Sequence, residues 1–176
     1  MNKAKVATVW LDGCSGCHMS LLDMDAAVIS LARKIDLVYG PLVDAQEFPE
    51  GVDVTLVEGA VSSQEDLNKL QRIRSRSHVL VSLGDCAVTG NVPSMRNSVP
   101  VGKLLQRIYV DGVEEGKTVP CERVPPLLKQ ARPLREFVKV DFYLPGCPPP
   151  AKAIASLLTT LLEGHKVEAG AKVKFG

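Results

Sequence analysis

Five short apolar runs alternate with amphipathic stretches along the chain, and each run has the length and composition of a β-strand. The runs lie at residues 5–11, 35–39, 52–57, 78–83 and 138–144. The first, third and fourth are almost continuously apolar, which is typical of strands covered on both faces. We therefore expect these three strands to form the centre of a parallel sheet.

The stretches between the runs have the spacing of helices. They predict helices over residues 20–34, from Ser63 to about Arg76, and over residues 151–163. Ser62 and Ser63, with Glu65 and Asp66 three residues later, are a helix-start signal, and prolines open the last helix. The alternation of strand and helix predicts one α/β domain over residues 1–176, with a flavodoxin-like, doubly wound parallel sheet.

The alternation stops between residues 92 and 135, where prolines are frequent. We interpret this segment as an irregular insertion before the last strand, with one short helix around residues 103–109. A structureless loop of this length is unusual inside a compact domain. We therefore expect the segment to pack on a partner or to carry small elements of its own. A weak strand pattern follows in the tail, over residues 166–176.

Composition narrows the possible functions. The net charge is +1, from 21 basic and 20 acidic residues, which argues against a nucleic-acid partner. No apolar stretch reaches the roughly 20 residues of a membrane span, and no signal peptide precedes the first strand. We therefore expect a cytoplasmic protein. Its five cysteines are then reduced, which favours metal or redox chemistry over disulfides.

Four of the five cysteines follow the ends of predicted strands, and each has a glycine close by. Cys14 and Cys17 follow the first strand, Cys86 follows the fourth, and Cys147 follows the fifth. Open α/β sheets bind ligands at the carboxyl ends of their strands, so we expect the four thiols to meet at that edge. Four cysteine thiolates can hold one [4Fe–4S] cluster.

Other interpretations of these cysteines remain open. A Cys-x-x-Cys pair between a strand and a helix is also typical of a thioredoxin-like dithiol, which would leave Cys86 and Cys147 without a role. Structural zinc is a second alternative, although zinc sites usually contain two close pairs, whereas gaps of 68 and 60 residues separate these single cysteines. The spacing favours the cluster. Cys121 follows no strand, and we expect it to stay a free thiol.

Some charged residues have two possible roles. Glu58 ends the third strand, where it is either a solvated or cap-side carboxylate or one that tunes a cluster or passes protons. We expect His18 to cap the next helix or to face a partner. The basic run of Arg72, Arg74 and Arg76 predicts a solvated helix face. A flavin phosphate site is disfavoured, because no Ser/Thr-rich loop follows the first strand.

The motifs at the strand ends resemble those of the small subunits of [NiFe]-hydrogenases, and the resemblance covers about residues 5–163. The motifs are Asp12–His18, Glu58–Gly59, Gly84–Ala87 and Pro145–Pro149. Within that family, the segments Val9–Cys14 and Gly90–Asn97 are most similar to the small subunit of the soluble NAD-reducing (bidirectional) type.

The resemblance implies that Cys14, Cys17, Cys86 and Cys147 bind one [4Fe–4S] cluster, proximal to a Ni–Fe centre held by a separate large subunit. It implies that electrons from H2 pass to a diaphorase module with FMN and further iron–sulfur clusters, and then to NAD. The reaction of the complex would be H2 + NAD+ giving NADH + H+, with no catalysis by this chain alone. Whether an additional FMN binds in this fold stays open.

Two related classes are the alternatives. One is the single-cluster small subunit of a membrane-bound energy-converting hydrogenase. The other is the cluster-bearing subunit of respiratory complex I, which has adjacent cysteines in place of the Cys-x-x-Cys pair. Membrane-bound uptake hydrogenases have longer small subunits with an exported leader and two more clusters, which this chain does not match. We expect a large subunit and diaphorase subunits as partners, and no direct insertion into a membrane.

Overall fold

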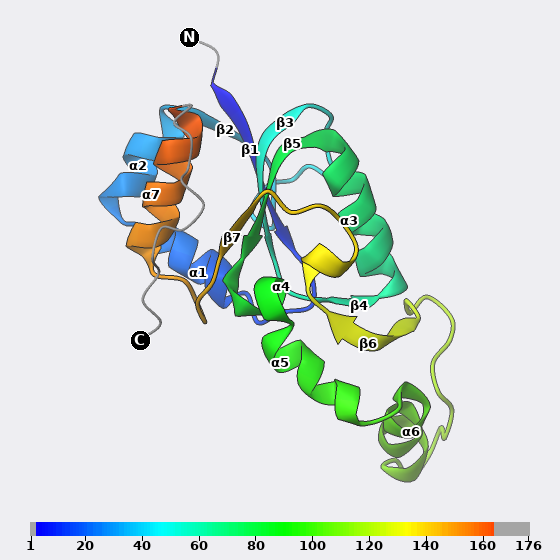
Figure 1. Ribbon diagram of the computed structural model, residues 1–176. Helices are drawn as coiled ribbons and strands as arrows, with labels where there is room; N and C mark the ends of the chain where they lie inside the picture. The colour runs from blue at the N-terminus through cyan, green and yellow to red at the C-terminus, as the bar shows by residue number, and fades with distance from the viewer. Residues whose placement is uncertain (1–2, 164–176) are drawn as a thin grey trace.

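The computed structural model describes residues 3–163 and contains a five-stranded parallel sheet in the order β2-β1-β3-β5-β7 (Figure 1). The strands are β1 (Ala4–Trp10), β2 (Ile35–Tyr39), β3 (Val52–Glu58), β5 (Ser77–Leu83) and β7 (Phe142–Leu144). This order is that of the flavodoxin-like doubly wound sheet. The predicted fold class is confirmed, with β1, β3 and β5 at the centre.

Helices cover both faces of the sheet (Figure 1). On one face lie α1 (Gly16–Leu22), α2 (Ala26–Ala32) and α7 (Ala151–Leu162), and on the other lies α3 (Gln64–Arg76). In β3, Val54 and Leu56 pack toward the first group, whereas Val57 belongs to the core beneath α3. The two faces are therefore both apolar, which explains why the central strands are apolar without alternation.

The predicted helix over residues 20–34 is wrong as a single element. The structure has two helices, α1 and α2, separated at residues 23–25. Asp25 has φ 49, which a continuous helix does not allow. Aspartate is a poor residue for a helix interior because its short side chain competes for backbone hydrogen bonds. Since α1 begins at Gly16, Cys17 lies in its first turn instead of in the preceding loop.

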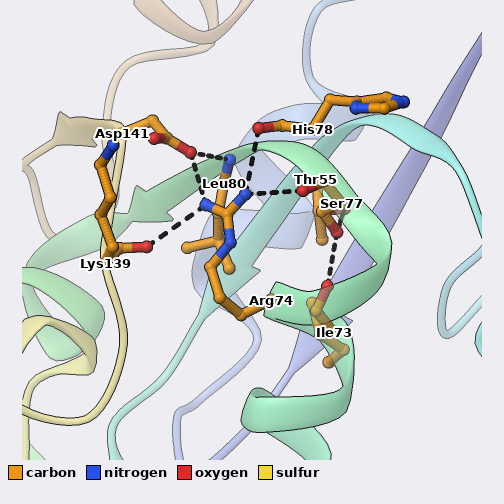
Figure 2. A network of polar contacts seen from close by, with 8 residues as sticks. All are labelled: Thr55, Ile73, Arg74, Ser77, His78, Leu80, Lys139 and Asp141. Carbon is orange, nitrogen blue, oxygen red and sulfur yellow. Dashed lines mark hydrogen bonds and ion pairs between the residues drawn. The ribbon is translucent and has the colours of Figure 1, made fainter.

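The predicted strand over residues 138–144 is regular only in its last three residues, β7. Just before β7, the Leu80 N–H donates to the Asp141 carboxylate at 2.9 Å, and the Asp141 N–H donates to Leu80 O at 3.0 Å. A side-chain oxygen therefore occupies the place of a backbone acceptor, and parallel pairing begins only afterwards, at Val81 and Phe142. Figure 2 shows Arg74 of α3 binding both this carboxylate and Lys139 O.

The segment over residues 92–135 contains several short elements. They are α5 (Asn91–Ser94), η1 (Met95–Ser98), α6 (Val101–Gln106), η2 (Arg107–Asp111), β6 (Leu127–Arg132) and η3 (Leu134–Glu136). Strand β6 pairs antiparallel with β4 (Val61–Ser63), and the Asn97 amide makes two 2.8 Å hydrogen bonds to the Ala131 backbone. The segment is thereby fixed to the main body of the protein.

Two observations bear on the ends of the chain and on membranes. The strand pattern expected in residues 166–176 lies outside the described residues, so it stays a prediction. Within residues 3–163, no helix has both the length and the apolar character needed to cross a bilayer.

Candidate metal centre

The last residues of four neighbouring strands lie in one row across the sheet. Trp10 pairs with Glu58, Glu58 pairs with Leu83, and Leu83 pairs with Leu144. The four cysteines follow this row, in segments that leave the sheet at β1, β5 and β7: Cys14, Cys17, Cys86 and Cys147. The cysteine-bearing segments therefore leave the sheet at one edge, as the strand order requires.

Close packing around the Cys-x-x-Cys pair depends on glycine. The Gly16 N–H donates to Cys14 Sγ at 3.4 Å. Gly84, which follows β5, has φ +81, and a Cβ built there would lie 2.2 Å from Cys17 Sγ. Only glycine fits at that position, both for its backbone conformation and for the space it leaves beside the sulfur. The β1 and β5 segments are thus in contact at Cys17.

Hydrogen bonds join the cysteine-bearing segments to one another. Asp85 Oδ1 accepts the Gly146 N–H at 2.8 Å, and the Asp85 N–H donates to Gly146 O at 2.9 Å. The Ser20 hydroxyl of α1 donates to Pro149 O at 2.6 Å. The segment carrying Cys147 is therefore held on two sides. Sequence reasoning missed both connections. Only the first had a visible signal, the position of Asp85 between Gly84 and Cys86.

Glu58 is buried, so its interpretation as a solvated carboxylate is wrong, whereas the cap-side alternative agrees with its contact to the first turn of α1. It is 2% exposed, and its Oε2 accepts the backbone N–H of His18 at 2.9 Å. His18 is also buried, at 6% exposed, and its side chain neither caps α1 nor lies on the surface. Its Nδ1 lies 2.9 Å from the same Oε2. Glu58 therefore fixes the first turn of α1, which contains Cys17.

The four thiols and Glu58 are close enough to affect one another electrostatically. Burial raises the pKa of Cys17 to about 12, and the negative charges of Glu58 and the other three cysteines add to that rise. Burial also raises the pKa of Cys86. A hydrogen bond with the Val92 N–H lowers that pKa but offsets only part of the rise. Four thiolates together are unfavourable here unless a bound cation compensates for their charge.

The arrangement fits an iron–sulfur cluster in its donor set, because four thiols lie in segments that leave the sheet at one edge. Cys14 and Cys147 are exposed, and Cys17 and Cys86 are half-buried. Within residues 3–163, no group of three or more histidine, cysteine or carboxylate side chains is gathered for a single metal ion. A [4Fe–4S] cluster takes one thiolate per iron, so its ligands surround a volume instead of a point. Cys121 is exposed, in the segment between η2 and β6.

The comparisons with known proteins agree with this geometry. Residues 14–161 match the family described as the NADH ubiquinone oxidoreductase, 20 Kd subunit, and the chain belongs to that family. The chain is 39% identical over 168 residues to the NAD-reducing hydrogenase HoxS subunit delta of Cupriavidus necator, covering 93% of this chain and 80% of that protein. Its resemblance to [NiFe]-hydrogenase small subunits is confirmed.

A solved structure of an NAD+-reducing [NiFe]-hydrogenase in the H2-reduced state superposes on the chain with a TM-score of 0.90. The identity is 38%, and the match covers 94% of each chain. A subunit of the vhu F420-non-reducing hydrogenase of Methanocaldococcus jannaschii is 37% identical over 171 residues, which are 96% of this chain and 59% of that protein. The chain thus spans under two thirds of the methanogen relatives' length.

Proposed function

We propose that this chain is the electron-transfer small subunit of a [NiFe]-hydrogenase and binds one [4Fe–4S] cluster through Cys14, Cys17, Cys86 and Cys147. The observation that carries the proposal is the placement of all four cysteines just past one row of strand ends, in a fold with a TM-score of 0.90 to a hydrogenase chain. The cluster supplies a one-electron carrier when it is bound.

The surrounding residues hold the ligands in place. Gly84 provides the space beside Cys17, and Asp85 fixes the spacing of the segments that carry Cys86 and Cys147. Glu58 binds the His18 N–H and places a buried negative charge near Cys17. That charge favours the oxidised form of a nearby carrier, so it lowers the reduction potential.

The same edge is the proposed interface with a large subunit that holds the Ni–Fe site. Two of the ligands are exposed, and large apolar side chains next to the cysteines are exposed too: Trp10, Met19 and Val92. A patch of this kind is typical of an interface. A large subunit that covers the patch would bring its buried Ni–Fe site close to the thiols. The family match and the hydrogenase relatives support this arrangement.

For the electron acceptor we propose NAD, reached through diaphorase subunits with FMN and further clusters, in the cytoplasm. Support comes from the NAD-reducing proteins, which match this chain at 38–39% identity over most of their own length. The complex would catalyse H2 + NAD+ giving NADH + H+. Four F420-non-reducing relatives, at 34–37% identity, support a second candidate, a hydrogenase with a different acceptor.

H2-dependent reduction assays on the anaerobically purified complex separate the two candidates. The proposal predicts NAD+ reduction together with reduction of a viologen dye, and co-purification of a flavin-bearing subunit. Viologen reduction without NAD+ reduction would favour the second candidate. Co-purifying membrane subunits would favour the energy-converting class instead.

The cavity between the sheet and α1 and α2 has a volume of about 180 Å³, and no lysine or arginine lines it to bind a phosphate. Its residues do not fit FMN.

A further inference from the structure

The sheet face beneath α1 and α2 contains an apolar cavity of about 180 Å³. Its walls come from β1, α1, α2, β2, β3 and α7, and include Val6, Leu21, Met24, Val28, Leu56 and Leu158. An apolar protein cavity of about 150 Å³ is known to bind benzene. This cavity therefore has room for one six-membered ring.

One side chain in the wall, that of His18, is polar and lacks a hydrogen bond. The side chain is 8% exposed, and both ring nitrogens are buried without a hydrogen-bond partner. Nδ1 lies 2.9 Å from Glu58 Oε2 without the geometry of a hydrogen bond, and Nε2 has no such neighbour. Buried polar atoms in native proteins are nearly always paired, so an unpaired one indicates a missing partner.

Water is a poor candidate for that partner. A buried water molecule needs two to four polar partners. Apart from backbone groups, the lining offers only His18 and the Thr8 hydroxyl, which is the minimum for one water molecule and too few for the several that a volume of about 180 Å³ would hold. The chemistry of the wall instead matches an occupant that is apolar over most of its surface and carries one polar group.

We propose that this cavity binds a small, mostly apolar molecule of one-ring size, with a single hydroxyl group directed at Nε2 of His18. A hydroxyl both donates and accepts hydrogen bonds, so it satisfies Nε2 in either protonation state of the ring. Leu37 and Leu42 also line the cavity and are exposed, which places an entrance beside the edge strand β2.

Calorimetric titration of the anaerobically purified protein with phenol and with toluene tests the proposal. The two probes share the ring and differ in the hydroxyl group. We expect saturable binding of both, with phenol bound about 3- to 10-fold more tightly because of one hydrogen bond. His18→Leu should abolish the preference for phenol and retain toluene binding.

Two variants of α2 locate the binding site. Val28→Phe places a ring inside the cavity and should abolish binding of both probes, whereas Ile29→Phe lies on the exposed side of the same helix and should not. The proposal is overturned if wild type shows no saturable binding, or if Val28→Phe binds as wild type does. A preference for phenol that survives in His18→Leu also overturns it.

A measurement on wild-type protein covers the case in which His18→Leu does not fold. The chain has three histidines, so nitrogen-15 labelling of histidine gives few signals. Phenol should shift the His18 Nε2 resonance, and toluene should shift it much less. Equal shifts from both probes, or no shift, would contradict the proposed hydrogen bond.

Discussion

Asp85 and Gly146 hydrogen-bond to each other twice, across the gap between two of the strand ends that carry cysteines. The Gly146 N–H donates to Asp85 Oδ1 at 2.8 Å, and the Asp85 N–H donates to Gly146 O at 2.9 Å. Each residue directly precedes a cysteine, Cys86 or Cys147. The pair therefore sets the relative position of two of the four proposed ligands.

Replacing Asp85 tests this positioning role. Asp85→Ala removes the acceptor for the Gly146 N–H, and we expect a cost of about 1–3 kcal/mol in the free energy of unfolding. Iron loss to a chelator should accelerate by about tenfold. Asp85→Asn retains an oxygen acceptor and is the matched control, with iron loss close to wild type. Equal acceleration in both variants would show that the hydrogen bond does not hold the ligands.

Gly84 offers a test of the space around Cys17. In Gly84→Ala, the new Cβ would lie 2.2 Å from Cys17 Sγ, in a backbone conformation with φ +81. We expect most of the bound iron to be lost, measured as iron per purified chain. Gly51→Ala is the control, because Gly51 also has a positive φ, +66, but open space around it. It carries the backbone strain alone, about 1 kcal/mol, and should retain iron.

The ligand assignment separates Cys147 from Cys121. Cys147→Ser should lower both iron content and H2-dependent turnover by at least about tenfold, because a [4Fe–4S] cluster needs four thiolates. Cys121→Ser should leave both near wild type, since Cys121 is exposed in the segment between η2 and β6. Equal losses in the two variants would contradict the assignment.

Asp141 makes stability depend on pH. Burial alone would raise its pKa, but the Leu80 N–H and the Arg74 guanidinium outweigh burial and hold the pKa below its ordinary value. A carboxylate of this kind stabilises the fold above its unfolded-state pKa, and this stabilisation is lost as pH falls through the folded-state pKa. We expect Asp141→Asn to cost about 1–3 kcal/mol at about pH 7.

Urea unfolding of wild type and Asp141→Asn at several pH values checks this expectation. The difference in unfolding free energy should be complete at about pH 6 and shrink toward zero below about pH 3. Asp36→Asn, in the edge strand β2 and exposed, is the control and should change stability by under about 0.5 kcal/mol. A difference that grows as pH falls would contradict the sign.

Local signals in the sequence predicted much of the fold. Ser63 and Asp66 form the expected capping box, and α3 begins where that motif places it. Strand β2 has the predicted bounds, Ile35–Tyr39. The central positions of β1, β3 and β5 followed from their almost continuously apolar sequences, which are typical of strands covered on both faces. The positions of the cysteines relative to the strand ends followed directly from the sequence.

Contacts between distant segments could not be predicted in this way. Arg74 belongs to a basic run that predicted a solvated face, yet it binds Asp141, which lies 67 residues away in the chain. Glu58 and His18 are buried together because the turn after β3 meets the first turn of α1. Such partners have no periodic signal, since their meeting depends on tertiary packing. The break of the helix at Asp25 was visible only as a weak propensity.

The central claim is that four cysteines at one sheet edge hold a [4Fe–4S] cluster. The most direct test measures iron, acid-labile sulfide and zinc per chain on anaerobically purified protein, with Cys147→Ser alongside. We predict about four irons and four sulfides per chain, after subtraction of clusters on partner subunits, and a loss of both in the variant. Zinc without sulfide, or iron that the variant retains in full, would contradict the claim.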